Sequence, residues 1–247
     1  MKIQRTRMLT QYFIKLTARL SIFIAVLVTY LINKPFLYRV MTKKFTQLGL
    51  TPLHLLWAVF MGLMLIHLFP GKRILTMALR KRKEENFKEA PNYSELELLH
   101  FVQRQNISAW RVLLVWLSFN CFWGLLYLFH IVDNADLLML TVFYFLCDYI
   151  CILFFCPFQT LIMKNKCCVN CRIYDWGHFM MFTPMLFIRN FYSWSLFFTS
   201  VVVLIHWEII YAKYPERFWF GSNQNLQCAH CKDKTCQVKQ TIKEKIS

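Results

Sequence analysis

The chain has 247 residues, of which 57% are hydrophobic and 17% are charged, and its formal net charge is +16. Soluble domains average roughly 45–50% apolar and about 25% charged residues, so this composition excludes an ordinary soluble domain. Intrinsic disorder and collagen-like repeats are excluded as well, because the chain is apolar and holds only 6 glycines. The apolar residues are gathered in blocks, which is typical of a protein that spans a membrane several times.

Five apolar blocks predict an all-α polytopic membrane bundle of about five spans, within a range of four to six, with a Cys-rich cytoplasmic loop and tail. Four of the blocks reach the roughly 20 residues that a helix needs to cross the hydrocarbon core. Helices are expected because lipid cannot satisfy the open backbone groups of other structures. The blocks are 20–32, 48–69, 112–132, 137–163 and 191–211.

The first block is the shortest, and two interpretations of it stay open. Residues 1–19 form a basic amphipathic arm, which either lies on the membrane surface before the chain enters the bilayer or continues the span as one long tilted helix. In the second case Lys15 and Arg19 reach along the helix to the head groups.

A sixth apolar block, 176–188, is too short to span the bilayer as an α-helix, which rises about 1.5 Å per residue. It also contains Pro184. We expect this block to re-enter the membrane, to lie at the interface, or to form half of a hairpin with the last span. The side of the membrane on which the C-terminus lies depends on this choice.

The basic connections set the predicted orientation. Residues 70–111 and 164–178 are rich in Lys and Arg, whereas the short link 133–136 holds two acids and no base. By the positive-inside rule the N-terminus, both basic connections and the basic tail 212–247 face the cytoplasm, and the cell membrane is the expected location. The connection that carries Lys34 goes against this rule. The expected segments are 1–19, 20–69, 70–111, 112–163, 164–178, 179–211 and 212–247.

The loop 70–111 has two further features. Ser94 and Glu97 form a capping-box pattern, which predicts the start of a short helix. The run RKRK at 80–83 either binds anionic lipid head groups or only fixes the topology. The bilayer is therefore the expected partner. Nucleic acid is not expected, because membrane topology already explains the net charge.

Ten cysteines are unevenly distributed, and two Cys-x-x-C pairs carry the strongest chemical signal. Cys168 pairs with Cys171 after the fourth block, and Cys228 pairs with Cys231 in the tail. Two such pairs offer four thiolates to one tetrahedral ion, as in structural zinc sites. Zinc is the expected metal, with an iron–sulfur cluster as the alternative and haem disfavoured. The candidate ligands are Cys167, Cys168, Cys171, Cys228, Cys231, Cys236, His178 and His230.

Polar residues also occur at membrane depth. Asp148 lies near the centre of the fourth block, Asn120 lies near the middle of the third, and His54 lies in the second. Such residues are costly in lipid and usually face a cavity or a partner, so we expect the three to meet. They would form a proton or ion path, or a neutral Asp148 would hydrogen-bond to Asn120 and hold two helices together.

Three functions are compatible with the sequence. The preferred one is a membrane protein with a cytoplasmic cysteine-ligated metal site, which requires both cysteine pairs to lie on the same side. The second is a membrane thiol–disulfide oxidoreductase that exchanges electrons with a quinone. A Cys-x-x-C such as Cys168/Cys171 beside a span of a small bundle resembles the disulfide-forming quinone reductases and the vitamin K epoxide reductases. That resemblance implies cysteines on the oxidising side, opposite to the side that the basic loop predicts.

The third function is a small transporter or channel built around Asp148. No nucleophile elbow, phosphate loop or His-Glu-x-x-His motif is present. Catalytic residues, and whether the protein is an enzyme, therefore stay open.

Overall fold

The computed structural model describes residues 6–37, 51–69, 84–91, 93–165, 167, 171–230 and 236–239. Regular structure in these ranges is helical, and their one β-bridge, between Glu89 and Asn223, is isolated. The prediction of an all-helical chain is confirmed, and four of the described helices are long and apolar enough to cross a membrane: α1 (Arg7–Ile32), α5 (Glu95–Leu128), α6 (Asn134–Leu153) and α8 (Phe191–Lys213). A further apolar helix, α3 (Pro52–Leu68), is shorter than these, with 17 residues.

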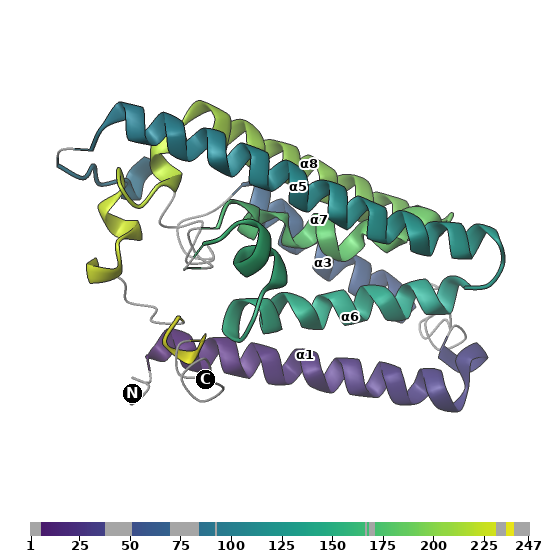
Figure 1. Ribbon diagram of the computed structural model, residues 1–247. Helices are drawn as coiled ribbons and strands as arrows, with labels where there is room; N and C mark the ends of the chain where they lie inside the picture. The colour runs from purple at the N-terminus through teal and green to yellow at the C-terminus, as the bar shows by residue number, and fades with distance from the viewer. Residues whose placement is uncertain are drawn as a thin grey trace.

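Helix α1 is continuous through both the basic arm and the first apolar block (Figure 1). Thr6 caps it by accepting a hydrogen bond from the backbone N–H of Leu9 at 3.2 Å. Leu9 and Tyr12, in its amphipathic first turns, are buried in a cluster with Leu153 at the end of α6. The arm is therefore part of one long helix that packs along α6, as in the second of the two interpretations.

Helix α5 has 34 residues and joins the predicted loop helix to the third span without a break. It begins after Ser94, where the capping-box pattern predicts a helix start, although the Ser94 side chain makes no cap hydrogen bond. Glu95 and Glu97 in its first turn interact favourably with the helix dipole. Its early turns also contact the tail, where the rings of Phe101 and Trp219 stack at 5.7 Å.

Residues 172–188, named the central segment, run as three consecutive short helices: η3 (Arg172–Trp176), α7 (Gly177–Phe182) and η4 (Thr183–Phe187). Two of them are 3₁₀-helices, which rise about 2.0 Å per residue instead of about 1.5 Å. The three helices together can therefore cover about 29 Å, more than the α-helical rise alone would give for the same number of residues. Part of this length comes from residues 172–175, which precede the apolar block 176–188.

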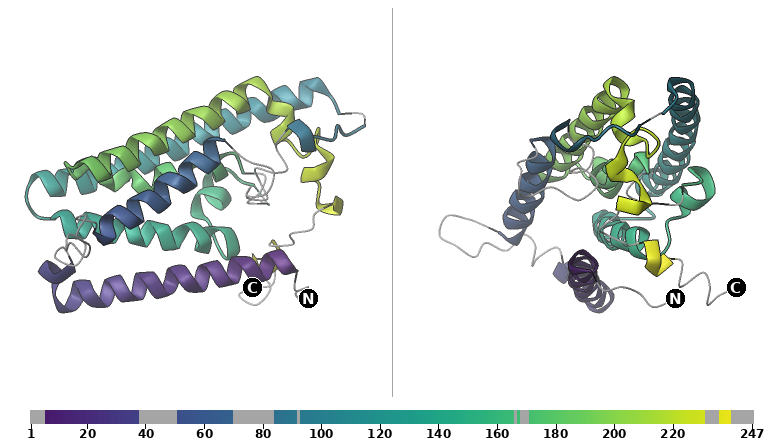
Figure 2. Two further views of the ribbon diagram at one scale, coloured as in Figure 1. Left: turned by 180° about the vertical axis from the view of Figure 1, so that it is seen from behind. Right: turned by 90° about the vertical axis from the view of Figure 1, so that its left-hand side faces the viewer.

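The central segment lies inside the bundle and runs parallel to α5 (Figure 2). At its start, Arg172 hydrogen-bonds to Asn106 of α5. At its end, Phe187 lies so close to Gly124 of α5 that an added Cβ there would sit 2.3 Å from the ring. Both 3₁₀-helices also contact α8. Because protein covers this irregular backbone on several sides, its polar groups avoid lipid, as membrane depth requires.

The course of the central segment decides at which end of the bundle the tail lies. The bundle has a near end, where α1 starts and α6 finishes, and a far end, where α1 finishes and α6 starts. Helix α8 starts after the central segment and carries the chain back, so that Val238 of the tail packs with Leu9, Tyr12 and Leu153. The described part of the tail therefore lies at the near end, together with the start of α1.

The main hydrophobic core lies between α3, α6, α8 and the central segment. Met64, Leu137 and Val203, one from each of the three helices, have no exposed surface. Lipid provides no hydrophobic drive for helices to associate, so close packing and small residues must hold them together. Gly124 against Phe187 is one such contact, and the buried Ser200 of α8 is another small residue in the packing.

Candidate functional site

Arg19 and Asp148 form an ion pair between α1 and α6. Arg19 Nη1 lies 2.8 Å from Asp148 Oδ2 and 2.6 Å from the carbonyl oxygen of Phe145. The guanidinium also lies over the rings of Phe145 and Tyr149, 4.0 Å from each centroid. In one interpretation of the sequence, the Arg19 side chain reaches the head groups. In the structure it contacts Asp148 instead, and the attraction between the two charges offsets the free-energy cost of removing each of them from water.

The second oxygen of Asp148 faces the backbone of the central segment. A Cβ added to Gly177 would lie 3.3 Å from Asp148 Oδ1, so the glycine leaves space for the carboxylate. Within the described part of the chain, Arg19 is the hydrogen-bond donor to Asp148. The Asp148 side chain remains 35% exposed. The carboxylate is therefore held by a cation on one side and is not fully covered by protein.

Two histidines extend this polar group across the bundle. His178 of α7 contacts His67 near the end of α3, with ring centroids 5.3 Å apart. His178 directly follows Gly177, whose added Cβ would lie against Asp148. His67 in turn lies against Trp207 of α8 at 5.8 Å. Among the described residues no hydrogen-bond partner reaches the buried Nε2 atom of His67.

The Arg–Asp–His cluster consists of Arg19, Asp148, His178 and His67, contributed by α1, α6, α7 and α3. A neutral imidazole can donate a hydrogen bond from one nitrogen and accept one at the other. A carboxylate beside it can hold a proton that an imidazole accepts or returns. The arrangement is therefore suited to proton transfer between elements that pack against one another in the bundle interior.

Two further ion pairs lie at the far end, where Lys34, just beyond the C-cap of α1, meets the start of α6. Lys34 Nζ lies 2.9 Å from Asp133 Oδ2 and 2.8 Å from Asp136 Oδ1. Tyr30 donates a hydrogen bond to Asp136 Oδ1, and the backbone N–H of Asp133 donates to Asp136 Oδ2 at 2.8 Å. These contacts neutralise the lysine that goes against the predicted orientation. The other basic residues of that connection, and the run at 80–83, lie outside the described residues.

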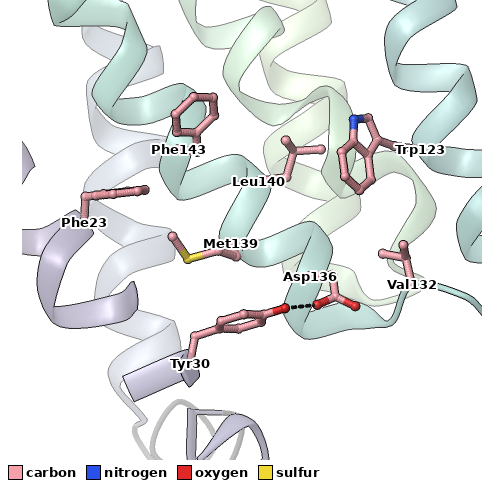
Figure 3. A pocket seen from close by; sticks show the side chains of 8 residues that line it. All are labelled: Phe23, Tyr30, Trp123, Val132, Asp136, Met139, Leu140 and Phe143. Atoms are coloured by element: carbon pink, nitrogen blue, oxygen red, sulfur yellow. Dashed lines mark hydrogen bonds between the residues drawn. The ribbon is translucent and has the colours of Figure 1, made fainter. Parts of the chain in front are cut away.

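A cavity of about 460 Å³ lies beside these pairs (Figure 3). Its walls are mainly aromatic and aliphatic, and the hydroxyl of Tyr30 bonded to Asp136 provides the polar part. Both oxygens of that carboxylate already have donors. The Asp136 carboxylate in the cavity wall is therefore already hydrogen-bonded through both oxygens. Its lining residues are Phe23, Tyr30, Trp123, Val132, Asp136, Met139, Leu140 and Phe143.

Asn120 and His54, which the sequence groups with Asp148, have partners of their own. Asn120 is almost fully buried and donates to the carbonyl oxygen of Trp116 at 2.9 Å, while Tyr144 donates to its Oδ1 at 3.3 Å. His54 lies in the first turn of α3, where its Nε2 is 2.6 Å from the hydroxyl of Tyr192. His54 thus belongs to the start of α3 and His67 to its end. The hydrogen bonds of the three predicted residues lead to different partners.

The cysteine-rich segments both lie toward the near end. Cys171 is buried in an apolar cluster with Trp176, whereas Cys228 is exposed in the tail. Cys167 and Cys236 are partly buried. Among the residues that the structure describes, no three His, Cys, Asp or Glu side chains gather as a metal-binding group. The predicted ligands Cys168 and Cys231, and the side chain of His230, lie outside the described residues.

Arg172, Glu208 and Trp176 form another polar contact between the central segment and α8. Arg172 pairs with Glu208 Oε2, and the indole N–H of Trp176 donates to Glu208 Oε1 at 2.8 Å. The guanidinium also lies 4.2 Å from the ring centroid of Tyr211. Each carboxylate oxygen of Glu208 thus has a donor, which is the arrangement of a structural contact.

Sequence reasoning singled out Asp148 and His178 but missed that they lie in one cluster. Arg19 and Asp148 are 129 positions apart, and no local pattern links them. The available signal was the cost of Arg19 itself, because a cation in a long apolar helix needs a partner. The chain matches no family model, and no curated protein or solved structure is significantly similar to it. The functional argument therefore rests on the geometry of the site.

Proposed function

We propose that this helical membrane protein moves protons, alone or with a small solute, through the Arg–Asp–His cluster, with Asp148 as the central proton-carrying group. The observation that carries the proposal is the position of the Asp148 carboxylate. It is paired with Arg19 on one side, lies against Gly177 on another, and keeps 35% of its side chain exposed. Ionisable residues among membrane helices are functional sites by default because they are expensive to keep there.

The pairing of Asp148 leaves part of its hydrogen-bonding capacity unused. Arg19 reaches Oδ2 through one nitrogen and uses that same nitrogen for the carbonyl oxygen of Phe145. A purely structural pair would favour the two parallel bonds of a bidentate contact. No described residue donates a hydrogen bond to Oδ1, which faces Gly177. We assign the transported proton to this oxygen.

The histidines supply the next acceptors. His178 follows Gly177 directly, and its ring contacts the ring of His67. An imidazole that accepts a proton on one nitrogen can release one from the other. A proton held at Asp148 can therefore pass to His178 and on toward His67. Each of these groups belongs to a different helix, so a small shift of the central segment would connect or separate them.

Proton flux into sealed vesicles tests the proposal. The purified chain is reconstituted with a pH-sensitive dye inside, and an outward potassium gradient with valinomycin drives proton entry. We expect entry well above that of protein-free vesicles, and its loss in Asp148→Asn. His178→Gln should also slow it. Asp136→Asn is the matched control, because it makes the same change on the same helix in an ion-paired carboxylate outside the cluster.

Two results would contradict the proposal. Flux of the wild-type chain equal to that of empty vesicles is one, provided that the protein is monodisperse and inserted. Equal flux in Asp148→Asn and wild type is the other. Reconstitution of every variant is verified by the amount of protein in the vesicles and by its elution as a single species in detergent.

A cysteine-ligated metal at the near end is a second candidate function. The observation that favours it is that the central segment and α8 return the tail to the end at which Cys167 and Cys171 lie. A structural zinc ion there would fasten the tail to the loop, and an iron–sulfur cluster is the alternative. Metal analysis of protein purified without oxygen tests it. Cys168→Ser and Cys228→Ser should lose the same metal, and loss in only one variant would contradict a shared site.

A further inference from the structure

Four residues of the C-terminal tail, 236–239, dock against the near ends of α1 and α6 (Figure 1). The Val238 side chain among them is 4% exposed. It packs with Leu9, Tyr12 and Leu153, the first two from α1 and the third from α6. An apolar side chain in this position removes water from the surfaces that it contacts. The docked segment therefore covers the seam between the two helices at the near end of the bundle.

Lys239 fastens the docked segment to the end of α6. Its Nζ lies 2.8 Å from the carbonyl oxygen of Cys151 and 2.9 Å from Gln159 Oε1. Cys151 belongs to the last turn of α6, where the negative end of the helix dipole favours a nearby cation. Gln159 is almost fully buried, and its Nε2 donates to the carbonyl oxygen of Asn165 at 2.9 Å. That hydrogen bond fixes the amide group with its oxygen toward Lys239.

A series of side-chain contacts leads from the docked segment to Asp148. Tyr149 packs against the cluster that contains Val238, and its ring lies 5.9 Å from the ring of Tyr12. The guanidinium of Arg19 lies on Tyr149, 4.0 Å from the ring centroid, and pairs with Asp148 at 2.8 Å. The apolar seam and its two tyrosines thus lie between the docked segment and the Arg19–Asp148 pair.

We propose that segment 236–239 is an autoinhibitory plug that limits the access of protons to Asp148 from the near end. This role rests on the proposed function, because it concerns entry to the same carboxylate. While Val238 is docked, apolar side chains keep water out of the seam between α1 and α6. When Lys239 releases the end of α6, Val238 leaves with it, and water reaches the Arg19–Asp148 pair along the seam.

Proton flux into vesicles tests the plug with two variants of the full chain. Lys239→Met keeps the apolar stem and removes the ammonium group, whereas Val238→Asp places a charge in an apolar cluster. Flux should rise in both variants. For Lys239→Met we expect about a tenfold increase, since hydrogen bonds to a charged group are lost from the docking equilibrium. Lys213→Met is the matched control, because it makes the same change at an exposed lysine at the near end of α8.

Hydrogen exchange of the backbone amides measures docking independently of flux. In the peptide that contains residues 236–239, exchange should be slow in the wild type and in Lys213→Met, and fast in Val238→Asp. Exchange that is equally fast in the wild type and Val238→Asp would overturn the inference, because the segment would not be docked.

A double variant shows whether the plug guards the path to Asp148. In Val238→Asp/Asp148→Asn the gain in flux should be lost. A gain that persists in the double variant would overturn the inference, as would equal flux in Val238→Asp and a conducting wild type. Absence of flux from every variant, Val238→Asp included, would instead contradict the proposed function on which the plug depends.

Discussion

Arg19 of α1 and Lys34, just beyond α1, each form ion pairs with α6 or its N-cap, and the two sites differ in what surrounds the carboxylate. At the far end, both oxygens of Asp136 accept hydrogen bonds, from Tyr30, Lys34 and a backbone N–H. Inside the bundle, Asp148 has Arg19 as its donor within the described residues and keeps an accessible side. A carboxylate whose two oxygens both accept hydrogen bonds holds helices together, whereas a carboxylate with one oxygen free of hydrogen bonds can exchange a proton.

The cations of the two pairs also differ. Lys34 bridges two acids at the end of the helix, one of them 60% exposed in its side chain. Arg19 lies between two aromatic rings, where its flat and weakly hydrated guanidinium packs well. The comparison teaches that similar ion pairs with α6 serve different purposes, according to how buried they are and how many hydrogen bonds the carboxylate accepts.

Removing Arg19 should have the largest effect. Arg19→Leu leaves Asp148 without its cation, and we expect a loss of about 3 kcal/mol, the lower end for a buried pair because Asp148 is partly exposed. Thermal unfolding in detergent measures it. The double variant Arg19→Leu/Asp148→Leu should recover most of the loss. If the double variant is as unstable as the single one, packing of the arginine stem and not the charge dominates.

Adding a methyl group beside the carboxylate should have the next largest effect. In Gly177→Ala the new Cβ would lie 3.3 Å from Asp148 Oδ1, so the carboxylate or the segment must shift. We expect a cost of about 1–2 kcal/mol and slower proton flux. Vesicle flux and thermal unfolding measured on one preparation check both. Unchanged flux in a stable variant would contradict the role given to the Gly177 side of Asp148.

Much of the helical framework could be predicted from the sequence, because long apolar blocks leave a membrane chain few alternatives to helices. The central segment could not be predicted from the sequence, because the length of an apolar block does not reveal whether its turns are 3₁₀-helical. The Arg–Asp–His cluster could not be predicted either. Arg19 lies on a polar stripe that indicates exposure, and only tertiary packing shows its partner.

Removing the Tyr30 hydroxyl, which bonds to Asp136, should have a smaller effect. Tyr30→Phe deletes one of the donors to Asp136 and leaves Lys34 and the backbone donor in place. We expect a loss of about 1 kcal/mol and no change in flux. The same unfolding and flux assays check this. A marked fall in flux would mean that the far-end carboxylate takes part in proton movement.

Removing the partly exposed Lys34 side chain should have the smallest effect. Lys34→Ala removes a pair that is partly open to solvent, and such pairs contribute about 0–1 kcal/mol. The unfolding midpoint should therefore stay close to that of the wild type and depend less on salt. A loss as large as that of Arg19→Leu would erase the distinction between the two pairs.

The most direct test of the central claim is covalent labelling of the two aspartates by a hydrophobic carbodiimide, which reacts with carboxyl groups that carry a proton. Labelling in vesicles is quantified by mass spectrometry of the peptides that contain Asp148 and Asp136. We predict that Asp148 is labelled increasingly as the pH falls, that this labelling stops proton flux, and that Asp136 stays largely unmodified. Preferential labelling of Asp136, or full labelling of Asp148 with flux unchanged, would contradict the account.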